Sequence, residues 1–160
     1  MNPMNLLGGT RSTDGSSVRP KRKLIRVFDV MTSGVLTLSP QDSFDDAIKL
    51  MAEHDYQYVI VTDDENKVVG IISQRDLVAS RWKITEWRTK RVREAMRFNP
   101  VCVTFRTPLM DAISIMITEK VNCVPVVKDN EVMCEMLTST DIMKSHLDLL
   151  STVSQSAEKN

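Results

Sequence analysis

The chain has 160 residues, of which 42% are hydrophobic and 26% charged, proportions that allow a folded core of ordinary size. Lysine plus arginine equals aspartate plus glutamate at 21 each, so the overall charge favours neither nucleic acid nor a membrane as partner. The sequence has no apolar run of about 20 residues, and its start does not resemble a secretory signal. With three cysteines and no CxxC spacing, we expect free thiols in a cytoplasmic protein.

The first half of the chain reads as one small folding unit behind a polar tail. Residues 1–23 are rich in Gly, Ser, Thr and Asn and show no periodicity, so we predict a disordered tail. A first domain is predicted over 24–80. Its elements in chain order are a strand over 35–38, a helix capped by Asp42, strands over 58–61 and 68–72 joined by a polar turn, and a helix from Ser73.

The second half repeats this order after a short connection. Residues 81–94 form a predicted basic linker with a net charge of +4, and both tryptophans lie in it. A second domain is predicted over 95–148, and residues 149–160 are predicted to form a polar, frayed tail. The elements of the second domain are a strand over 101–104, a helix capped by Thr107 with Pro108 in its first position, strands over 124–127 and 132–137, and a helix from Thr138.

The two halves are copies of one sequence pattern. When the chain is shifted by 65 positions against itself, residues 31–77 align with 96–142 without a gap. Nine positions are identical, and in the first copy they are Met31, Asp46, Ala47, Ile48, Met51, Val59, Val61, Asp64 and Asp76. A unit of about 55 residues is marginal alone. We therefore predict an α/β (α+β) fold in which two tandem β-α-β-β-α domains pack their sheets together with pseudo-twofold symmetry.

The motif Gly-Ile-Ile-Ser-Gln-Arg-Asp over 70–76, its second copy over 135–141 and the openings at Met31 and Met96 resemble the CBS (cystathionine β-synthase) domain. The resemblance covers roughly residues 25–147. It implies a CBS pair, or Bateman module, which binds AMP, ADP, ATP or S-adenosylmethionine between its domains and regulates another protein. It also implies a homodimer, an effector protein as partner, and Mg²⁺ only as a companion of a nucleotide.

The resemblance implies a role for particular residues. Asp76 and Asp141 would bind the ribose, and Ser73 and Thr138 would face the phosphate. The base would be framed by Thr37, Tyr56, Gln57, Tyr58, Cys102, Asn122, Cys123 and Val124. Elementary chemistry agrees, because an acceptor-only carboxylate suits a diol, and Arg75 in the first turn of a helix can contact an anion.

Each of these assignments has a simpler alternative. Ser73-x-x-Asp76 is also the pattern of a helix capping box, although one carboxylate oxygen can cap while the other binds a ribose. Tyr56 and Tyr58 are equally explained as packing residues. In the second copy, Glu135 replaces Gly70 and adds bulk and negative charge, and Thr140 replaces the cation Arg75. We therefore predict unequal sites, the first for a phosphorylated ligand and the second for a neutral or cationic ligand or none.

Other classes of function have less support in the sequence. The basic linker with Trp82 and Trp87 is compatible with a nucleic-acid-binding adaptor, but a solvated segment held by its tryptophans explains it better, because the net charge of the chain is zero. A structural dimerisation module with unused pockets is a further alternative. His54 and His146 pair with no nucleophile, and no His/Cys cluster has metal-ligand spacing, so we expect neither an enzyme nor an intrinsic metal site.

Overall fold

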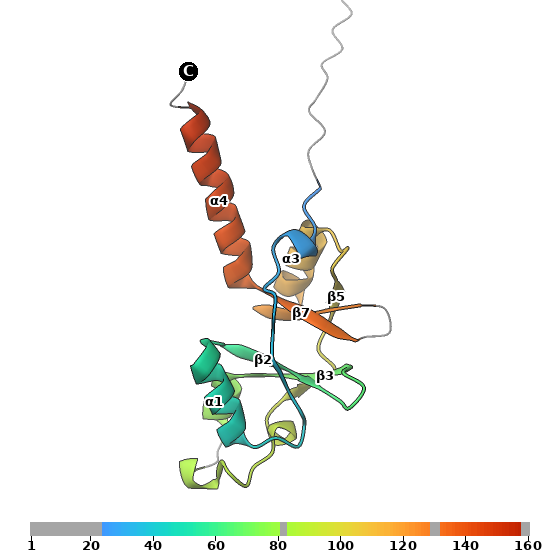
Figure 1. Ribbon diagram of the computed structural model, residues 1–160, viewed down its shortest axis with the longest axis vertical. Helices are drawn as coiled ribbons and strands as arrows, with labels where there is room; N and C mark the ends of the chain where they lie inside the picture. The colour runs from blue at the N-terminus through green and yellow to red at the C-terminus, as the bar shows by residue number, and fades with distance from the viewer. Residues whose placement is uncertain (1–23, 81–82, 129–131, 158–160) are drawn as a thin grey trace, which may run out of the picture.

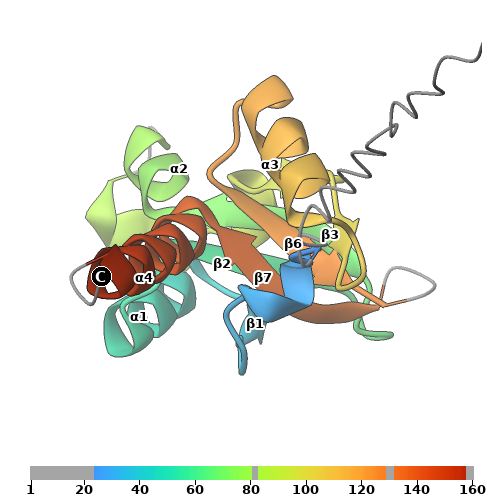
Figure 2. The same ribbon diagram turned by 90° about the horizontal axis from the view of Figure 1, so that it is seen from above.

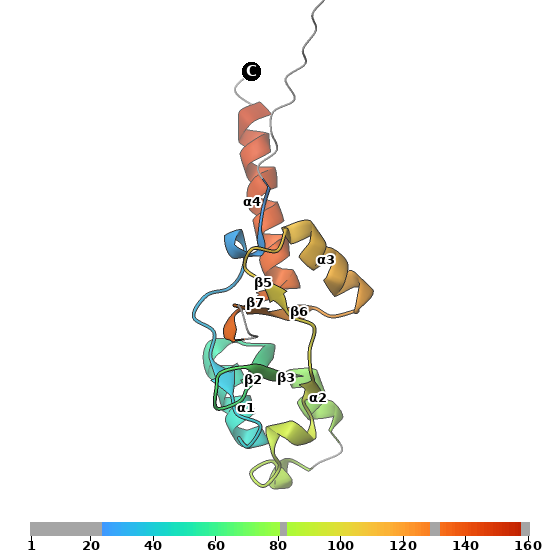
Figure 3. The same ribbon diagram turned by 90° about the vertical axis from the view of Figure 1, so that its right-hand side faces the viewer.

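The computed structural model describes residues 24–80, 83–128 and 132–157, so the predicted tail over 1–23, Trp82 and the turn at Asp129 lie outside it. Two small α/β units are stacked with their sheets facing each other (Figures 1 and 3). In chain order the elements are β1 (Thr37–Leu38), α1 (Phe44–His54), β2 (Tyr58–Thr62), β3 (Val68–Ser73), α2 (Gln74–Ala79), β4 (Arg97–Phe98), β5 (Val103–Thr104), α3 (Leu109–Thr118), β6 (Cys123–Val127), β7 (Met133–Thr138) and α4 (Ser139–Ala157).

The two sheets share one topology, as the repeat predicts. In the first, β1 runs parallel to β2, β2 and β3 form an antiparallel hairpin, and β4 adds an antiparallel edge. In the second, β5 is parallel to β6, and β6 is antiparallel to β7. Both hairpins change register after the fourth residue of their first strand, at Val61 and at the equivalent Val126. The predicted pair of β-α-β-β-α domains is confirmed.

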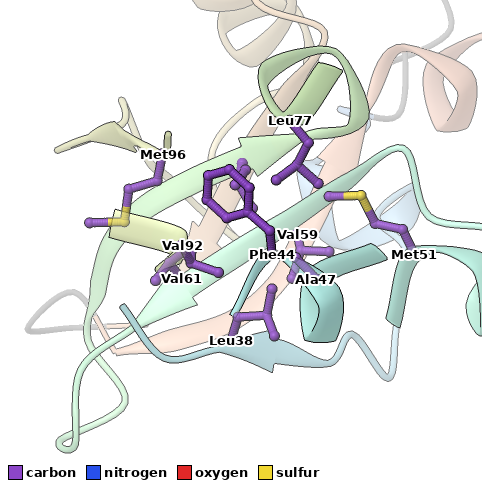
Figure 4. Close-up of a cluster of buried hydrophobic side chains, with 10 residues drawn as sticks. Leu38, Phe44, Ala47, Met51, Val59, Val61, Leu77, Val92 and Met96 are labelled. Atoms are coloured by element: carbon purple, nitrogen blue, oxygen red, sulfur yellow. The ribbon is translucent and has the colours of Figure 1, made fainter. Parts of the chain in front are cut away.

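Each unit has its own apolar core between its sheet and its helices. The first is centred on Phe44 of α1, which packs with Met51 and with Leu77 of α2 over β2 (Figure 4). The second is built by Ala112 and Met116 of α3 against Val124 and Leu137. The apolar residues of α1 and α3 recur at helical spacing because one face of each helix is buried.

A third apolar cluster joins the inner faces of the two sheets. Ile60 and Ile71 of the first sheet pack against Cys123, Met133 and Met136 of the second. The hairpin loop of the first unit also bonds to the second sheet, because the N–H of Met133 donates to the carbonyl of Asn66 over 2.8 Å. Viewed along the stacking direction, one sheet lies over the other (Figure 2). This contact fixes the two units relative to each other and so defines the clefts between them.

The units exchange the short segments that precede their first strands. Val27 is fully buried in the second core, and its N–H donates to the carbonyl of Thr107 over 3.0 Å. Reciprocally, Val92 is fully buried in the first core, and its N–H donates to the carbonyl of Asp42 over 2.8 Å. The segment coloured blue in Figure 1 accordingly lies beside α3. The predicted domains follow the sequence repeat, whereas packing crosses their boundaries at both openings.

Three local predictions differ from the structure. Helix α1 is capped by Ser43, whose hydroxyl accepts from the N–H of Asp46, while Asp42 instead closes a turn. Pro108 is the N-cap of α3 rather than its first residue, and Thr107 bonds to Thr104. Helix α4 continues to residue 157 and projects beyond the sheets (Figures 1 and 3), so most of the predicted frayed tail is helical.

Candidate ligand-binding clefts

Two clefts lie at the junction of the units, with volumes of about 320 and 340 Å³. The first is lined by the start of α2 and the second by the start of α4. Gln57, Tyr58 and Asn122 line both clefts. Because Gln57 and Asn122 are equivalent in the repeat, the pair lies where the two clefts meet and contributes to each.

The motif of the first copy forms a capping box that opens into the first cleft. The hydroxyl and the N–H of Ser73 both donate to Oδ2 of Asp76, over 2.6 and 2.8 Å, and the N–H of Asp76 donates back to the hydroxyl over 3.1 Å. Among the described residues, no hydrogen bond to Oδ1 of Asp76 is present. The capping interpretation is therefore correct for one oxygen, and the other is available to a ligand.

The second copy repeats this cap but fills the remaining oxygen. Thr138 donates to Oδ2 of Asp141 from its hydroxyl over 2.6 Å and from its N–H over 2.8 Å. The hydroxyl of Thr32 donates to Oδ1 of the same carboxylate over 2.7 Å. Thr32 belongs to the exchanged segment and is held by a bond from its N–H to the carbonyl of Met136. A ligand diol in the second cleft therefore has to share Asp141 with a threonine.

Three cations from separate segments line the first cleft. Arg75 lies in α2, Arg97 opens β4, and Lys120 follows α3 of the other unit. Nε of Arg97 is 3.9 Å from Oδ2 of Asp76, so a positive charge lies beside the capped carboxylate. Three cations against one carboxylate give this cleft a formal charge of +2. Such a site attracts an anionic group placed next to a diol.

The second cleft has the opposite balance. Its charged lining comprises Asp55, Asp141 and Lys144, which gives a formal charge of −1 when His54 is neutral. Thr140 occupies the place that Arg75 has in the first copy. The cleft is also lined by Tyr56, whose ring centroid lies 5.4 Å from that of His54. The lining of the second cleft is therefore partly aromatic and carries a small negative formal charge.

Both tyrosines combine packing with exposure to a cleft. Tyr56 and Tyr58 are half-buried and pack against the cluster between the sheets. Tyr56 lines the second cleft only, and Tyr58 lines both. Gln57 is exposed between them, and its carbonyl accepts from the N–H of Gln74 at the start of α2. The two explanations offered by the sequence, packing and ligand contact, therefore apply to the same side chains.

Four of the residues expected near the base lie outside both clefts. Thr37 bonds to Thr62 within the first sheet, and the thiol of Cys102 donates to the carbonyl of Pro100. Val124 is fully buried in the second core. Cys123 is buried between the sheets, and this burial raises the pKa of its thiol to about 12. None of these four residues lines either cleft, and their contact with a base stays a prediction.

Gly70 has a packing role at the edge of the first sheet. A side chain at this position would place its Cβ 2.6 Å from Sδ of Met96 and 3.2 Å from the carbonyl oxygen of Arg97. The glycine therefore allows β4 to approach β3, and it does not line a cleft. Glu135, its counterpart, is likewise absent from the lining of the second cleft. The inequality of the clefts has to be explained by other residues.

Eleven residues that line the clefts were not among the predicted site residues. They include Arg97 and Lys120 in the first cleft, and Thr32, His54, Asp55 and Lys144 in the second. The two openings, Met-Thr and Met-Arg, were visible as equivalent positions in the repeat. Their exchange between units was not, because a shift of the sequence against itself carries no information on which sheet each segment joins.

The basic linker is part of the first unit. In its described residues, 83–94, Val92 belongs to the core and Trp87 packs against it half-buried. Lys90 forms an ion pair with Glu94 over 3.6 Å.

The part of the chain that the structure describes holds no group of three or more acidic, histidine or cysteine side chains placed to bind a metal. Within the same residues, no helix has both the length and the hydropathy needed to cross a membrane.

Comparison with known sequences identifies both units. The profile of the CBS domain matches residues 27–83 and again residues 92–148. The chain belongs to the CBS domain family. The two matches confirm the tandem CBS pair that the sequence resembles, and the first contains Ser73 and Asp76 while the second contains Thr138 and Asp141.

Relatives of this CBS pair include parts of larger proteins. Inosine-5′-monophosphate dehydrogenase of Methanocaldococcus jannaschii is 32% identical over 116 residues. That match covers 72% of this chain and 22% of the dehydrogenase, so the chain spans about a fifth of that relative.

Solved structures show the same arrangement of two CBS domains. CBSX2 from Arabidopsis thaliana, a CBS-pair protein, is 29% identical with a TM-score of 0.71, and the match covers 79% of this chain and 96% of CBSX2. A structure of CBSX2 in complex with AMP is 28% identical with a TM-score of 0.68, covering 78% of this chain and 97% of CBSX2.

Proposed function

We propose that this CBS pair is a regulatory module that binds an adenosine-type ligand in the first cleft and signals to a separate effector protein. Asp76 would accept from the ribose hydroxyls, and Arg75, Arg97 and Lys120 would neutralise a phosphate. Ser73 would hold the carboxylate in place through the cap. AMP, ADP and ATP are the expected ligands of this cleft, with Mg²⁺ only as a companion of the nucleotide.

The observation that carries the proposal is the composition of the first cleft. A carboxylate with one oxygen outside the cap lies beside three cations, in a cleft of about 320 Å³ between two packed units. A nucleoside monophosphate needs both an acceptor for its diol and positive charge for its phosphate. CBSX2, a related pair, binds AMP. A binding module explains these features without assigning any residue to catalysis.

Regulation would follow from the place of the clefts between the units. A ligand that contacts Asp76 of one unit and Lys120 of the other stabilises arrangements in which both contacts are made. Gln57 and Asn122, which line both clefts, would transmit occupancy of one to the other. The effector would respond to the resulting change in population.

Thermal unfolding with AMP, ADP, ATP, adenosine and S-adenosylmethionine tests the proposal. A ligand at about 100 times its Kd adds roughly 2.7 kcal/mol to the free energy of unfolding. Asp76→Asn should weaken AMP at least about tenfold in calorimetric titration, whereas Asp111→Asn, on the exposed face of α3, should leave its affinity unchanged. If none of the five compounds raises the melting temperature, the pair is better explained as a structural dimerisation module.

Nucleic-acid binding through the linker has less support. Its described residues are folded onto the first unit, where Trp87 and Val92 pack with the core and Lys90 is paired with Glu94. A mobility-shift assay at two salt concentrations distinguishes the functions, because phosphate-backbone binding weakens steeply as salt rises. We expect no shift at physiological salt.

A further inference from the structure

The cations of the first cleft are not repeated in the second. In the 65-residue alignment, Arg97 corresponds to Thr32, Lys120 to Asp55 and Arg75 to Thr140. Arg75, Arg97 and Lys120 line the first cleft, and Thr140, Thr32 and Asp55 line the second. Three positive positions have therefore become two neutral positions and one negative position in the same framework.

The backbone holds these positions equivalently, so the difference lies in the side chains. Arg97 pairs with Ile71 at the edge of the first sheet, and Thr32 pairs with the equivalent Met136 in the second. Lys120 and Asp55 each follow a helix in the left-handed conformation, with φ of 54° and 55°. Each enters a cleft whose capping box belongs to the other unit. We therefore expect a substitution at either place to change the charge of a cleft while the backbone geometry is kept.

The consequence is a difference in ligand charge. A phosphate group entering the second cleft lies near the carboxylates of Asp55 and Asp141. Among the described residues that line this cleft, Lys144 is the one lysine or arginine. Because like charges disfavour binding in a partly enclosed site, that cleft disfavours phosphates. A sulfonium or an uncharged group experiences no such repulsion, and the carboxylates attract a cation. Asp141 remains an acceptor for a ribose in exchange for the hydroxyl of Thr32.

We propose that the second cleft selects an adenosine-type ligand without a phosphate group, such as adenosine or S-adenosylmethionine, while the first selects a phosphorylated one. Thr32 and Asp55 determine this selection in the second cleft, and Arg97 and Lys120 in the first. The pair would then compare two classes of metabolite at once. This inference rests on the proposed adenosine-binding function.

Exchange of these residues tests the inference in the full chain by calorimetric titration. The wild type should bind one equivalent of AMP, and S-adenosylmethionine should still bind when AMP is saturating. Arg97→Thr with Lys120→Asp should weaken AMP at least about tenfold and leave S-adenosylmethionine unchanged. Thr32→Arg with Asp55→Lys should create a second AMP site and weaken S-adenosylmethionine. Arg93→Thr is the matched control, because Arg93 is exposed and lines neither cleft.

The outcomes separate the inference from the function on which it rests. Two equivalent AMP sites in the wild type, or displacement of S-adenosylmethionine by AMP, would overturn the inference and keep the nucleotide-binding function. The inference also fails if neither adenosine nor S-adenosylmethionine binds in the presence of AMP. Absence of binding by every adenosine compound would overturn the function itself. Thermal melting of each variant shows whether it is folded.

Discussion

The two CBS units share one topology but differ in the strand pairing at one edge of their sheets. In the first, Gly70 allows β4 to pair with β3 over two residues, Phe98 with Gly70 and Arg97 with Ile71. In the second unit, Glu135 takes the place of this glycine. The exchanged segment there forms a single β-bridge, between Thr32 and Met136. Adding a side chain at the edge thus shortens the strand pair and retains the residue that faces the cleft.

The outer surfaces of the units differ as well. Helix α3 exposes Met110 and Ile117, and α4 exposes Met143 and Leu147, each with more than half of its surface accessible. The equivalents of Ile117 and Met143 are Ala52 and Val78. At these two positions the second unit therefore exposes the larger apolar side chains. We propose this face as the surface of the expected homodimer, since it is also continued by Leu149 and Leu150 along the projecting part of α4.

The largest expected effect comes from making the first unit resemble the second at the edge. Gly70→Glu should lower the free energy of unfolding by about 3 kcal/mol, because its Cβ meets Met96 and Arg97 and its carboxylate enters an apolar edge. The reverse change, Glu135→Gly, should alter it by less than about 1 kcal/mol. Urea unfolding of both variants measures the difference. Equal losses would mean that the two edges are not packed differently.

A smaller effect is expected at the apolar face of the second unit. Met143→Glu should raise the dissociation constant of the homodimer about tenfold, because a charge would be desolvated in the interface. Val78→Glu changes the equivalent residue of the first unit and should leave association unchanged. Sedimentation equilibrium of the two variants measures association. If the wild type is monomeric, or if Val78→Glu has the larger effect, the dimer does not use this face.

The smallest effect concerns the aspartate in the first turn of α1 and of α3. Asp46 takes part in a capping box, whereas the equivalent Asp111 does not. The hydroxyl of Ser43 donates to the carboxylate of Asp46, and this hydrogen bond lowers the pKa of Asp46 below its ordinary value. The N-cap residue of α3 is Pro108, which has no side-chain group that could bond to Asp111. Asp46→Ala should cost about 1 kcal/mol and Asp111→Ala much less. Because the folded-state pKa is lowered, the contribution of Asp46 is complete above its ordinary carboxyl pKa of 3.8 and is lost as pH falls below that value and through the lowered folded-state pKa.

Unfolding titrations at pH 7 and pH 3 therefore distinguish the two aspartates. The difference between the wild type and Asp46→Ala should shrink at the lower pH, and Asp111→Ala should track the wild type at both. A pH-independent difference would show that the cost of Asp46→Ala comes from packing rather than from the charged cap.

The sequence predicts the fold because the repeat is local and periodic. Apolar spacing identifies α1 and α3, and the shift of 65 residues reveals two copies of one unit. The capping boxes at Ser73 and Thr138 follow from the motif alone. These features depend on residues close together in the chain, and so they are visible without coordinates.

The lining of the clefts was only partly predictable, because it is assembled from both units. Gln57 and Asn122 were found from their place before the middle strands, but Lys120 and Asp55 reach the clefts through left-handed turns after helices. The prediction of unequal sites used Glu135, which lies outside the second cleft, and the replacement of Arg75 by Thr140, which both line their clefts. The structure adds two further pairs to it, Arg97 with Thr32 and Lys120 with Asp55.

The central claim is that one framework holds two clefts of opposite ligand preference. A crystal structure of the chain grown with AMP and S-adenosylmethionine together tests it most directly. The account predicts AMP in the first cleft, with its ribose on Asp76 and its phosphate near Arg97, and S-adenosylmethionine in the second, on Asp141. AMP in both clefts, or S-adenosylmethionine beside Arg97, would contradict it.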